Sequence, residues 1–490
     1  MSTVSLPDHA TLSGARREAR ELQEAVRHRH PSALALLTDH GARHDPHEPL
    51  PLYVAHQVIA RAHGFADWPA LKHYFDLAVD LRWDVVPDPE VEPPADRFCR
   101  LAALRYDRDD PGRWREARAL LADCPDLVDD SVWAAAAAVD VAAVRRHLDR
   151  DPGLAARRGG PQRWSPLYHL AYARARTDAS EDDVVDLARI LLSAGADPHE
   201  GYLWAGQPTP FTLITGAFGD GEGGPERQPA HPHGVPLARL LLAAGADPND
   251  AQTLYNRMFG ADDDHLELLF AHGLGTGDGG PWRRRLGTAL DGPTQLLRAQ
   301  LAWAVDHGMA ARVRLLIAHG VDVGSPLPGG RTPLAAALVT GEGQIAGLLR
   351  EAGAPEPVLD AVDTLVAAVM AGDVAAVEAM RADGDVVERA RRRRPGLIVW
   401  ATARSRPAAV RLLVDLGFDV DARGRGDSPV EEEWETALHH AAGDGAAELV
   451  ELLLDAGADP SVRDRRFAAT PAEWARFAGH PGTAAVLDRR

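Results

Sequence analysis

The sequence has few cysteines, lysines and aromatic residues, and it lacks any long apolar run. With Cys99 and Cys124 as the only cysteines among 490 residues, the chain cannot form a disulfide scaffold or a zinc module with four thiolate ligands. The longest apolar run, residues 132–139, falls far short of the roughly 20 residues that a membrane-spanning helix needs. We therefore expect a protein with reduced thiols and no membrane partner.

The first 30 residues also lack the uninterrupted apolar stretch of a secretory signal, because Arg, Glu and His are spread through them. Lys72 is the only lysine among 53 basic residues, and this skew toward arginine is typical of a high-GC bacterial genome. We therefore expect a bacterial protein with a cytoplasmic localisation.

Basic residues are outnumbered by acidic ones, 53 to 72, which gives a formal net charge of −19. A hydrophobic fraction of 45% and a charged fraction of 26% are typical of a globular protein with a sizeable core. The length indicates about three ordinary domains or one repeat array. The acidic balance disfavours a surface that follows a phosphate backbone, so we expect no nucleic-acid partner.

A glycine-centred phrase recurs along the chain, in its clearest form at residues 191–198, 241–248 and 453–460. Weaker copies are centred on Gly41, Gly273, Gly320, Gly353, Gly384 and Gly417. From Gly320 to Gly417 the copies are 31 to 33 residues apart. A fixed period of this length is typical of a solenoid built from stacked repeats.

The last clear copy shows how one repeat folds. Thr436 can cap a short helix over residues 436–442, and the apolar residues between 449 and 454 have the spacing of a second helix. Gly457 follows immediately, at a position where a left-handed backbone is usual. Each antiparallel pair has apolar residues on more than one face, so neighbouring pairs must stack.

These repeats resemble ankyrin repeats. The family's Thr-Pro-Leu-His opening corresponds to residues 436–439 (Thr-Ala-Leu-His), 332–334 (Thr-Pro-Leu) and 165–168 (Ser-Pro-Leu-Tyr). The resemblance covers roughly residues 131–490 and implies that His439 is a structural clip between repeats. Residues 97–174 also resemble uncharacterised actinobacterial ankyrin-repeat proteins, and no activity comes with that resemblance.

Residues 10–80 have a separate helical pattern with a Gly64-Phe65 turn, and they resemble a small helical module that often precedes bacterial ankyrin arrays. We predict an all-α fold of three parts: a helical N-terminal module over residues 1–82, a linker rich in proline and acidic residues over 83–96, and a degenerate ankyrin-repeat solenoid over 97–490. Longer irregular segments interrupt the array near residues 199–236, 274–294 and 423–433.

Residues 219–224 and 275–280 have the glycine spacing of a dinucleotide-binding loop. Such a loop needs a strand before it and a helix directly after it, and neither stretch has that context. We predict no cofactor.

Two close histidine pairs, His231 with His233 and His439 with His440, are candidates for metal binding. A metal site needs three or four convergent ligands, and the sequence has no HExxH spacing. We predict structural roles for these histidines and no metal.

No Gly-x-Ser-x-Gly elbow occurs, and neither cysteine has an activating motif beside it. The acidic runs 262–264 and 431–433 are interpreted as solvated loop charge rather than as a general acid–base pair. We predict no catalytic residue and no enzymatic activity.

Residues 391–394 form a run of four arginines of the kind that can bind nucleic acid. This run falls in a loop where charge is expected, and the net charge of the chain opposes the interpretation. Regulation by direct DNA contact is disfavoured for the same reason. The Arg-Gly-Asp-Ser match at 425–428 is attributed to chance.

Aromatic residues make up only 6% of the chain, yet tryptophans recur near the loops and first helices of the array. In ankyrin solenoids these elements line the concave surface, and Trp, Tyr and Arg dominate interface energetics. Trp303 and Trp400 lie inside helical periods and are predicted to be core residues. We predict that a partner contacts Trp164, Tyr168, Trp204, Trp282 and Trp434. For the last three a core position is equally open.

The predicted function is therefore non-catalytic protein binding through the concave face and the inserted loops. The alternative is an enzyme whose site is assembled in the insertions 199–236 and 274–294. That alternative requires acids or histidines that converge on one pocket. The identity of the partner and the oligomeric state are left open by the sequence.

Overall fold

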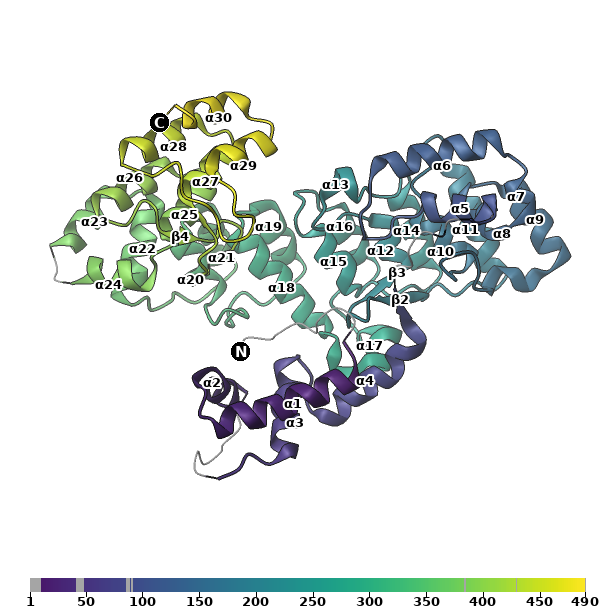
Figure 1. Ribbon diagram of the computed structural model, residues 1–490, viewed down its shortest axis with the longest axis horizontal. Coiled ribbons are helices and arrows are strands. Elements are labelled where there is room, and N and C mark those ends of the chain that lie inside the picture. Colours follow the sequence, from purple (N-terminus) through teal and green to yellow (C-terminus); the bar gives the residue numbers. More distant parts are fainter. Residues whose placement is uncertain are drawn as a thin grey trace. The chain divides into compact units, whose positions relative to one another are not determined.

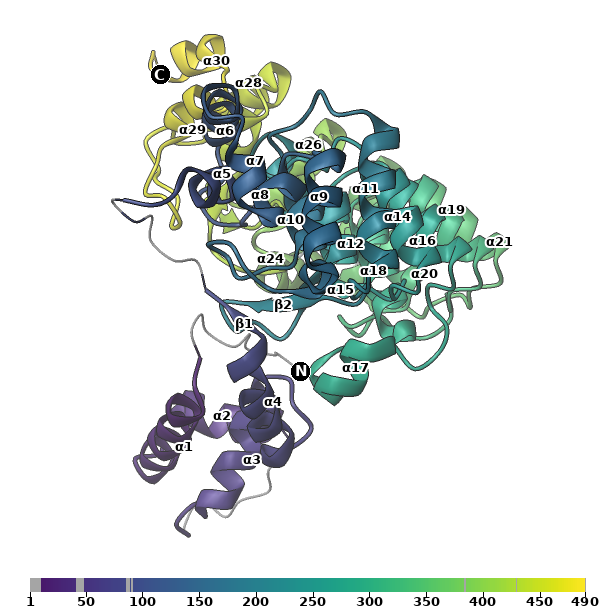
Figure 2. The same cartoon turned by 90° about the vertical axis from the view of Figure 1, so that its right-hand side faces the viewer.

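The computed structural model describes residues 10–40, 48–84, 89, 91–382, 385–428 and 430–489. The chain divides into two compact units, residues 1–297 and 298–490. Short helices dominate both units, and the few strands are two to four residues long (Figures 1 and 2). The predicted all-α class is confirmed.

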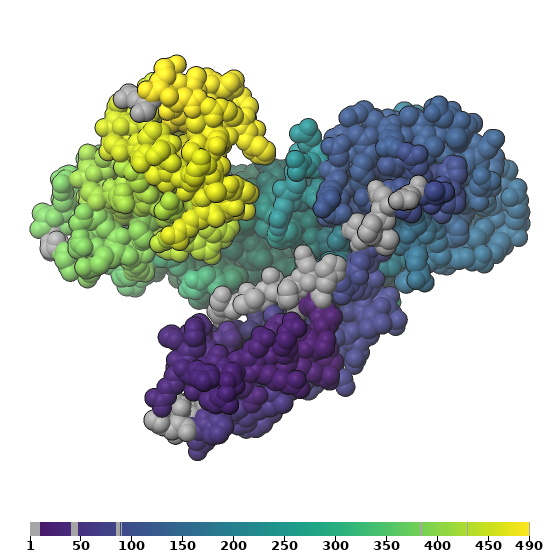
Figure 3. Space-filling view, in the orientation of Figure 1, coloured from purple at the N-terminus to yellow at the C-terminus, as the bar shows by residue number. Residues whose placement is uncertain are grey.

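The first unit begins with a four-helix module: α1 (Leu12–Arg27), α2 (Pro31–Asp39), α3 (Leu52–Ala62) and α4 (Trp68–Leu81). The side chain of Asp67 accepts a hydrogen bond of 2.8 Å from the amide of Ala70, which caps α4. The side chains of this module are drawn in purple in the space-filling view, which shows one of its faces (Figure 3). The predicted stops at Gly41 and Gly384 lie outside the described residues.

A small sheet joins this module to the rest of the first unit. It contains β1 (Arg82–Trp83), β2 (Gly201–Trp204) and β3 (Pro210–Thr212), in the order β1-β2-β3. β1 runs parallel to β2, with Trp83 opposite Trp204, and β2 runs antiparallel to β3. Ordered structure therefore enters the predicted linker, because Trp83 belongs to a strand.

The remaining helices of the first unit follow in chain order. They are α5 (Pro94–Ala102), α6 (Pro111–Asp123), α7 (Leu127–Asp130), α8 (Val132–Ala137), α9 (Val141–Arg150), the 3₁₀ helix η1 (Pro152–Ala156), α10 (Pro166–Tyr172), α11 (Glu181–Ser193), α12 (Leu213–Phe218), α13 (Gly224–Arg227), α14 (Gly234–Ala243), α15 (Ala251–Arg257), α16 (Asp264–Ala271), α17 (Gly280–Leu286) and the 3₁₀ helix η2 (Gly287–Ala289). Helix α18 (Pro293–Asp306) runs from the first unit into the second.

The second unit continues the same pattern. Its elements are α19 (Ala310–Ala318), α20 (Pro333–Val339), α21 (Gly343–Glu351), α22 (Ala361–Ala371), α23 (Val374–Arg381), α24 (Val386–Arg393), α25 (Leu397–Ala403), α26 (Pro407–Asp415), β4 (Arg423–Gly424), β5 (Glu435–Thr436), α27 (Ala437–Gly443), α28 (Ala447–Asp455), α29 (Pro471–Phe477) and α30 (Pro481–Leu487). β4 and β5 pair antiparallel, so residues 423–424 and 435–436 form the two arms of a hairpin.

Two of the predicted irregular segments contain regular structure. Residues 199–236 include β2, β3, α12, α13 and the start of α14, and residues 274–294 include α17 and η2. The expectation of irregular loops there is corrected. Thr212 caps α12 in the way that Thr436 caps α27, so part of the first segment is itself a repeat opening that the sequence motif does not show.

The recurring octets end equivalent helices. Leu191, Leu241 and Leu453 are each fully buried. The glycine after each of these helices has a left-handed backbone, with φ of 100° at Gly195, 103° at Gly245 and 95° at Gly457. The predicted helix stops are therefore confirmed, and at Gly457 an added Cβ would meet no atom within 4 Å, so only the backbone conformation requires glycine.

The histidine clip implied by the ankyrin resemblance is also present. Nδ1 of His439 lies 2.8 Å from the hydroxyl oxygen of Thr436, and Nε2 of His439 lies 3.0 Å from the carbonyl oxygen of Ala469. The second bond reaches the residue that precedes Thr470, the cap of α29. His439 therefore ties one helix pair to the next.

Candidate partner-binding surface

Four of the five residues predicted to contact a partner are buried. Trp164 and Tyr168 have no exposed surface, Trp204 is 7% exposed and Trp282 is 5% exposed. Their side chains are interior, so the prediction that they face a partner is corrected. Trp400, 2% exposed, is in the core as predicted, whereas Trp303, predicted with it, is only half-buried.

Three of the buried residues belong to one aromatic cluster of the first unit. The ring of Trp164 lies 4.7 Å from that of Tyr168, 5.3 Å from that of Trp83 and 6.1 Å from that of Trp204. The hydroxyl of Tyr168 donates to the carbonyl oxygen of Phe211 at 3.0 Å. The cluster is closed because β1 and the β2–β3 ribbon bring distant residues onto the first helices.

The two insertions of the first unit pack against the N-terminal module. Trp282, Leu286 and Leu290 share one apolar core with Leu71 and other residues of the module, and Leu203 of β2 joins it. The hydroxyl of Tyr74 in α4 donates to the backbone carbonyl of Gly206, which follows β2. These insertions therefore bury part of the protein's own chain.

Trp434, the fifth predicted residue, keeps some exposure, but two arginines lie over its ring. The guanidinium carbon of Arg425 lies 3.8 Å from the ring centroid, and that of Arg466 lies 4.1 Å from it. Arg425 is held in turn by Asp427 at 2.7 Å and Glu432 at 3.1 Å. Trp434 is therefore the centre of a cation–π stack that joins two successive hairpin loops.

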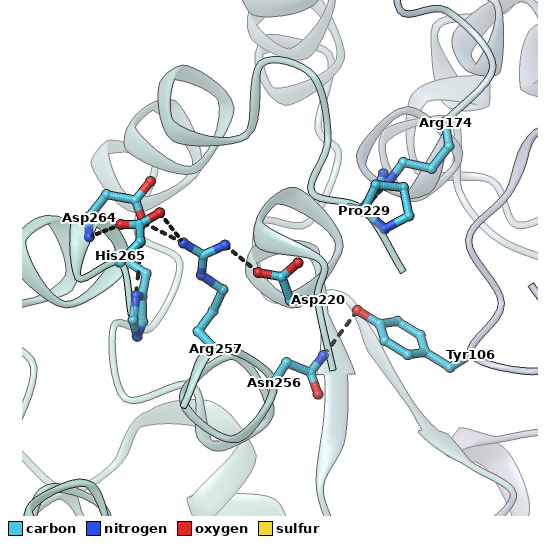
Figure 4. Close-up of polar contacts among 9 residues, drawn as sticks. Tyr106, Arg174, Asp220, Pro229, Asn256, Arg257, Asp264 and His265 are labelled. Atoms are coloured by element: carbon cyan, nitrogen blue, oxygen red, sulfur yellow. Dashed lines mark hydrogen bonds and ion pairs between the residues drawn. The ribbon is translucent and has the colours of Figure 1, made fainter. Parts of the chain in front are cut away.

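A second polar cluster lies in the first unit, around Arg257 at the end of α15 (Figure 4). Its guanidinium pairs with Asp220, with Asp262 at 2.7 Å and with Asp264 at 2.8 Å. Burial raises the pKa of Asp220, although the charge of Arg257 opposes the rise. The acidic run 262–264 is therefore partly a structural anchor, because two of its carboxylates tie α15 to the start of α16.

Tyr106 and Arg174 lie beside this anchor (Figure 4). The hydroxyl of Tyr106 accepts a hydrogen bond of 3.0 Å from the amide nitrogen of Asn256. Arg174 donates to the carbonyl oxygen of Pro229 at 2.7 Å and to that of Gly216 at 2.5 Å. Burial lowers the pKa of Arg174 to about 10. These groups hold the turn after α12 in place.

The arginine run 391–394 is neutralised by carboxylates. Arg391 and Arg392 pair with Glu388, Arg393 pairs with Asp360, and Arg394 pairs with Glu431 at 2.5 Å. These pairs do not leave a stripe of unpaired positive charge. The structural interpretation of this run is therefore favoured.

The histidine pairs are engaged with protein groups. Nε2 of His233 lies 2.7 Å from the carbonyl oxygen of Ala179, and Nε2 of His440 lies 2.8 Å from a carboxylate oxygen of Glu435. Over the described ranges, no group of three or more His, Cys, Asp or Glu side chains is arranged to hold a metal ion. The glycine stretch 219–224 follows helix α12 rather than a strand.

A small cavity lies between the two insertions of the first unit, where the enzyme alternative would place its site. It is lined by His199, Asp247, Asp250, Arg283 and Asp291, among others. Its volume is about 30 Å³, which is room for about one or two water molecules. The carboxylate of Asp250 is already occupied, because it accepts hydrogen bonds from Thr212, Thr215 and the amide of Thr253.

The second unit has a much larger, apolar pocket, which we call the aromatic pocket. Its volume is about 520 Å³, and it is lined by Gly443, Phe467, Ala469, Glu473, Trp474, Phe477 and Ala478. Its lining residues come from the end of α27, from α29 and from the loop before α29. Helices α27 and α29 pack side by side (Figure 1). Phe467 is 66% exposed and Phe477 is 91% exposed, which is unusual for such large apolar side chains.

Gly443 lines this pocket and leaves space in it because it has no side chain. A Cβ atom on Gly443 would lie 3.3 Å from the Trp474 ring, so any side chain there would press on that wall. Gly443 ends α27 with an ordinary negative φ, and its backbone does not require glycine.

One buried carboxylate holds the wall of the aromatic pocket. Asp464 accepts hydrogen bonds from the amides of Arg466, Phe467 and Ala469 at 2.6 to 3.0 Å, and from the indole nitrogen of Trp474 at 3.0 Å. Burial acts to raise the pKa of Asp464, but these hydrogen bonds outweigh it and hold the pKa below its ordinary value. The loop that presents Phe467 and the helix that presents Trp474 are therefore fixed to each other.

The aromatic pocket was not predicted from the sequence, although a signal is present. Thr470-Pro471 is a further repeat opening, and in the helix that follows Ala472 and Ala475 face the core. Trp474 and Phe477 have the same three-residue spacing on another side of the helix. Large aromatic residues outside the core stripe indicate an exposed apolar surface.

Comparison with known families identifies ankyrin repeats in the second unit. The model of the ankyrin-repeat family matches residues 365–464 in three copies. No curated protein matches the chain. Among the described residues, no helix is long and apolar enough to span a membrane. The matched stretch runs from α22 to the loop before α29, and this part of the chain consists of ankyrin repeats. It includes Gly443, which lines the aromatic pocket.

Proposed function

We propose that this protein is a non-catalytic binding scaffold that holds a protein partner on the second unit, at the aromatic pocket. Ankyrin repeats are generally modules of protein–protein interaction. The observation that supports the choice of site is the exposure of Phe467 and Phe477 around a pocket of about 520 Å³. A contiguous apolar surface of this kind is typical of a binding site rather than of free surface.

The proposed site is smaller than the surface expected from the sequence. The insertions 199–236 and 274–294 are occupied by the N-terminal module. Trp434, which follows the third insertion, contacts Arg466, and Arg466 in turn contacts Phe467 of the pocket. Trp434 therefore remains in the proposed site as a support for Arg466. The cavity of about 30 Å³ between the insertions offers no room for a substrate, which favours the scaffold over the enzyme alternative.

The test compares captured partners across matched baits. The full chain, its Phe467→Ser and Phe477→Ser variants and a control, Val374→Ser, are used to capture proteins from a bacterial lysate. Val374 is 58% exposed on α23 and lies outside the pocket. We expect the wild type and the control to retain a common set of proteins that both phenylalanine variants lose. The same set on all four baits would overturn the proposed site.

A further inference from the structure

An unpaired arginine stands at the edge of the aromatic pocket. Arg466 is exposed, and its guanidinium carbon lies 4.1 Å from the Trp434 ring centroid and 5.2 Å from that of Phe467. Within the part of the chain that the structure describes, this guanidinium donates no hydrogen bond and forms no ion pair. Two aromatic rings therefore hold a cation whose donors are all unused.

The carboxylates around Arg466 are already engaged by other groups. Asp464 accepts hydrogen bonds from backbone amides and from the indole of Trp474, and the others pair with arginines. Glu432 and Asp427 pair with Arg425. Glu433 pairs with Arg465 at 2.6 Å, and Glu473 pairs with Arg463 at 3.2 Å. These carboxylates are engaged by other groups, whereas the donors of the Arg466 guanidinium are not, so these donors remain open to an acidic group from outside the chain.

The stacking of Arg466 on aromatic rings favours the binding of an anion. A guanidinium presents its donors as a rigid planar fork that matches a carboxylate, and stacking on aromatic rings leaves the edge of the fork open. Ordering the side chain before binding also reduces the entropy lost when a ligand binds.

We infer that the partner binds through a short segment that inserts one large apolar side chain into the aromatic pocket and places a carboxylate on Arg466. This inference rests on the proposed function and specifies its partner. Arg466 lies 5.2 Å from the Phe467 ring, which itself lines the pocket. Because an extended peptide rises about 3.3 Å per residue, the acidic residue stands one or two positions from the apolar one.

The test is selection from a phage library of random nine-residue peptides on the full chain, followed by synthesis of the enriched peptides. We expect Phe, Trp, Leu or Met within two positions of Asp or Glu. Peptides without an acidic residue at that spacing would overturn the assignment of the carboxylate.

Affinities are then measured by fluorescence polarisation with a double-mutant design. Arg466→Gln should weaken the acidic peptide about tenfold, the size expected for a charge-assisted hydrogen-bonded pair, and should leave its amide analogue unchanged. Arg463→Gln is the matched control, because that arginine lies on the same loop and already has Glu473 as its partner. Equal losses for both peptides, or for both arginine variants, would overturn the inference.

Two pocket variants separate this inference from the proposed function. Phe477→Ser and Gly443→Leu should each abolish peptide binding, the second by filling the pocket. If they do so while Arg466→Gln has no effect, the carboxylate assignment is wrong and the pocket stands. If the selected peptides bind both pocket variants as tightly as the wild type, the proposed site fails as well.

Discussion

In the first unit the hydroxyl of Tyr168 donates to the carbonyl oxygen of Phe211 at 3.0 Å, and in the second unit Nε2 of His439 reaches the carbonyl oxygen of Ala469 at the same distance. Both donors stand three residues after a helix cap, and both acceptors directly precede the cap of a later helix. The junction between repeats therefore requires a donor of sufficient reach at this position, and tyrosine supplies it as well as histidine.

A third junction, in the second unit, uses another solution. Ala335 stands at the clip position after the Thr332 cap and has no donor in its side chain. Arg331 instead donates to a carboxylate oxygen of Asp363 in α22 at 3.0 Å. The connection between helix pairs is therefore kept while the side chain that makes it changes.

Truncation of the buried leucines that end the second helices should have the largest effect on stability, and the effect should be alike in the two units. Leu191→Ala and Leu453→Ala should each lower the free energy of unfolding by about 2–5 kcal/mol, because both leucines are fully buried. Chemical denaturation measures the loss, and hydrogen exchange locates it in the unit that carries the change. Leu454→Ala, at a half-buried neighbour, is the control and should cost less. A cost below about 1 kcal/mol at either buried position would show that the two positions are not equivalent.

Removal of the clips should lower the free energy of unfolding by different amounts in the two units. His439→Leu removes contacts to both Thr436 and Ala469, and we expect a loss of about 2 kcal/mol. Tyr168→Phe removes only one hydroxyl and keeps the ring packing, so we expect about 1 kcal/mol. Tyr53→Phe, at a tyrosine that is 75% exposed, is the control. Equal losses for the two clip variants would show that the second contact of His439, to Thr436, does not add to stability.

The smallest predicted effect is a pH dependence of the clip in the second unit. Burial lowers the pKa of His439 below its ordinary value of about 6.5, although the bond to Ala469 opposes the shift. The unfolded chain then takes up a proton more readily than the folded chain, so stability falls as the pH drops below about 6.5. Burial raises the pKa of Tyr168 well above its ordinary value, and this clip stays neutral.

Hydrogen exchange of the α27 amides at pH 7.5 and pH 5.5, corrected for intrinsic rates, measures this effect. Protection should be lower at the acidic pH in the wild type, and the His439→Leu variant should lack that part of the change. An identical pH dependence in the variant would show that other groups cause it.

The repeat could be predicted from the sequence because its signals are local. The spacing of Leu449 to Leu454, the stop at Gly457 and the cap at Thr436 all lie within one helix pair, and the structure has each of them. The burial of Trp204 and Trp282 could not be predicted in the same way. It depends on packing with α4 and β1, which lie more than a hundred residues earlier in the chain, and no periodicity reports such a contact.

The same separation along the chain explains why the predicted binding residues are buried. The residues next to Trp282 in the sequence do not show what covers its side chain. In the structure the N-terminal module covers it. The aromatic pocket differs, because Trp474 and Phe477 stand out against Ala472 and Ala475 within one short helix. That contrast is visible in the sequence alone.

The shared core of the N-terminal module also sets an order of events during synthesis. Leu71 and Tyr74 leave the ribosome early, but the residues that complete their packing extend to Leu290. At a translation rate of roughly 5 to 20 residues per second, the residues up to Leu290 are synthesised on the order of 10 to 40 s after the module itself. During that interval its apolar side is open to chaperones, and the first unit can close only after most of its own chain has emerged.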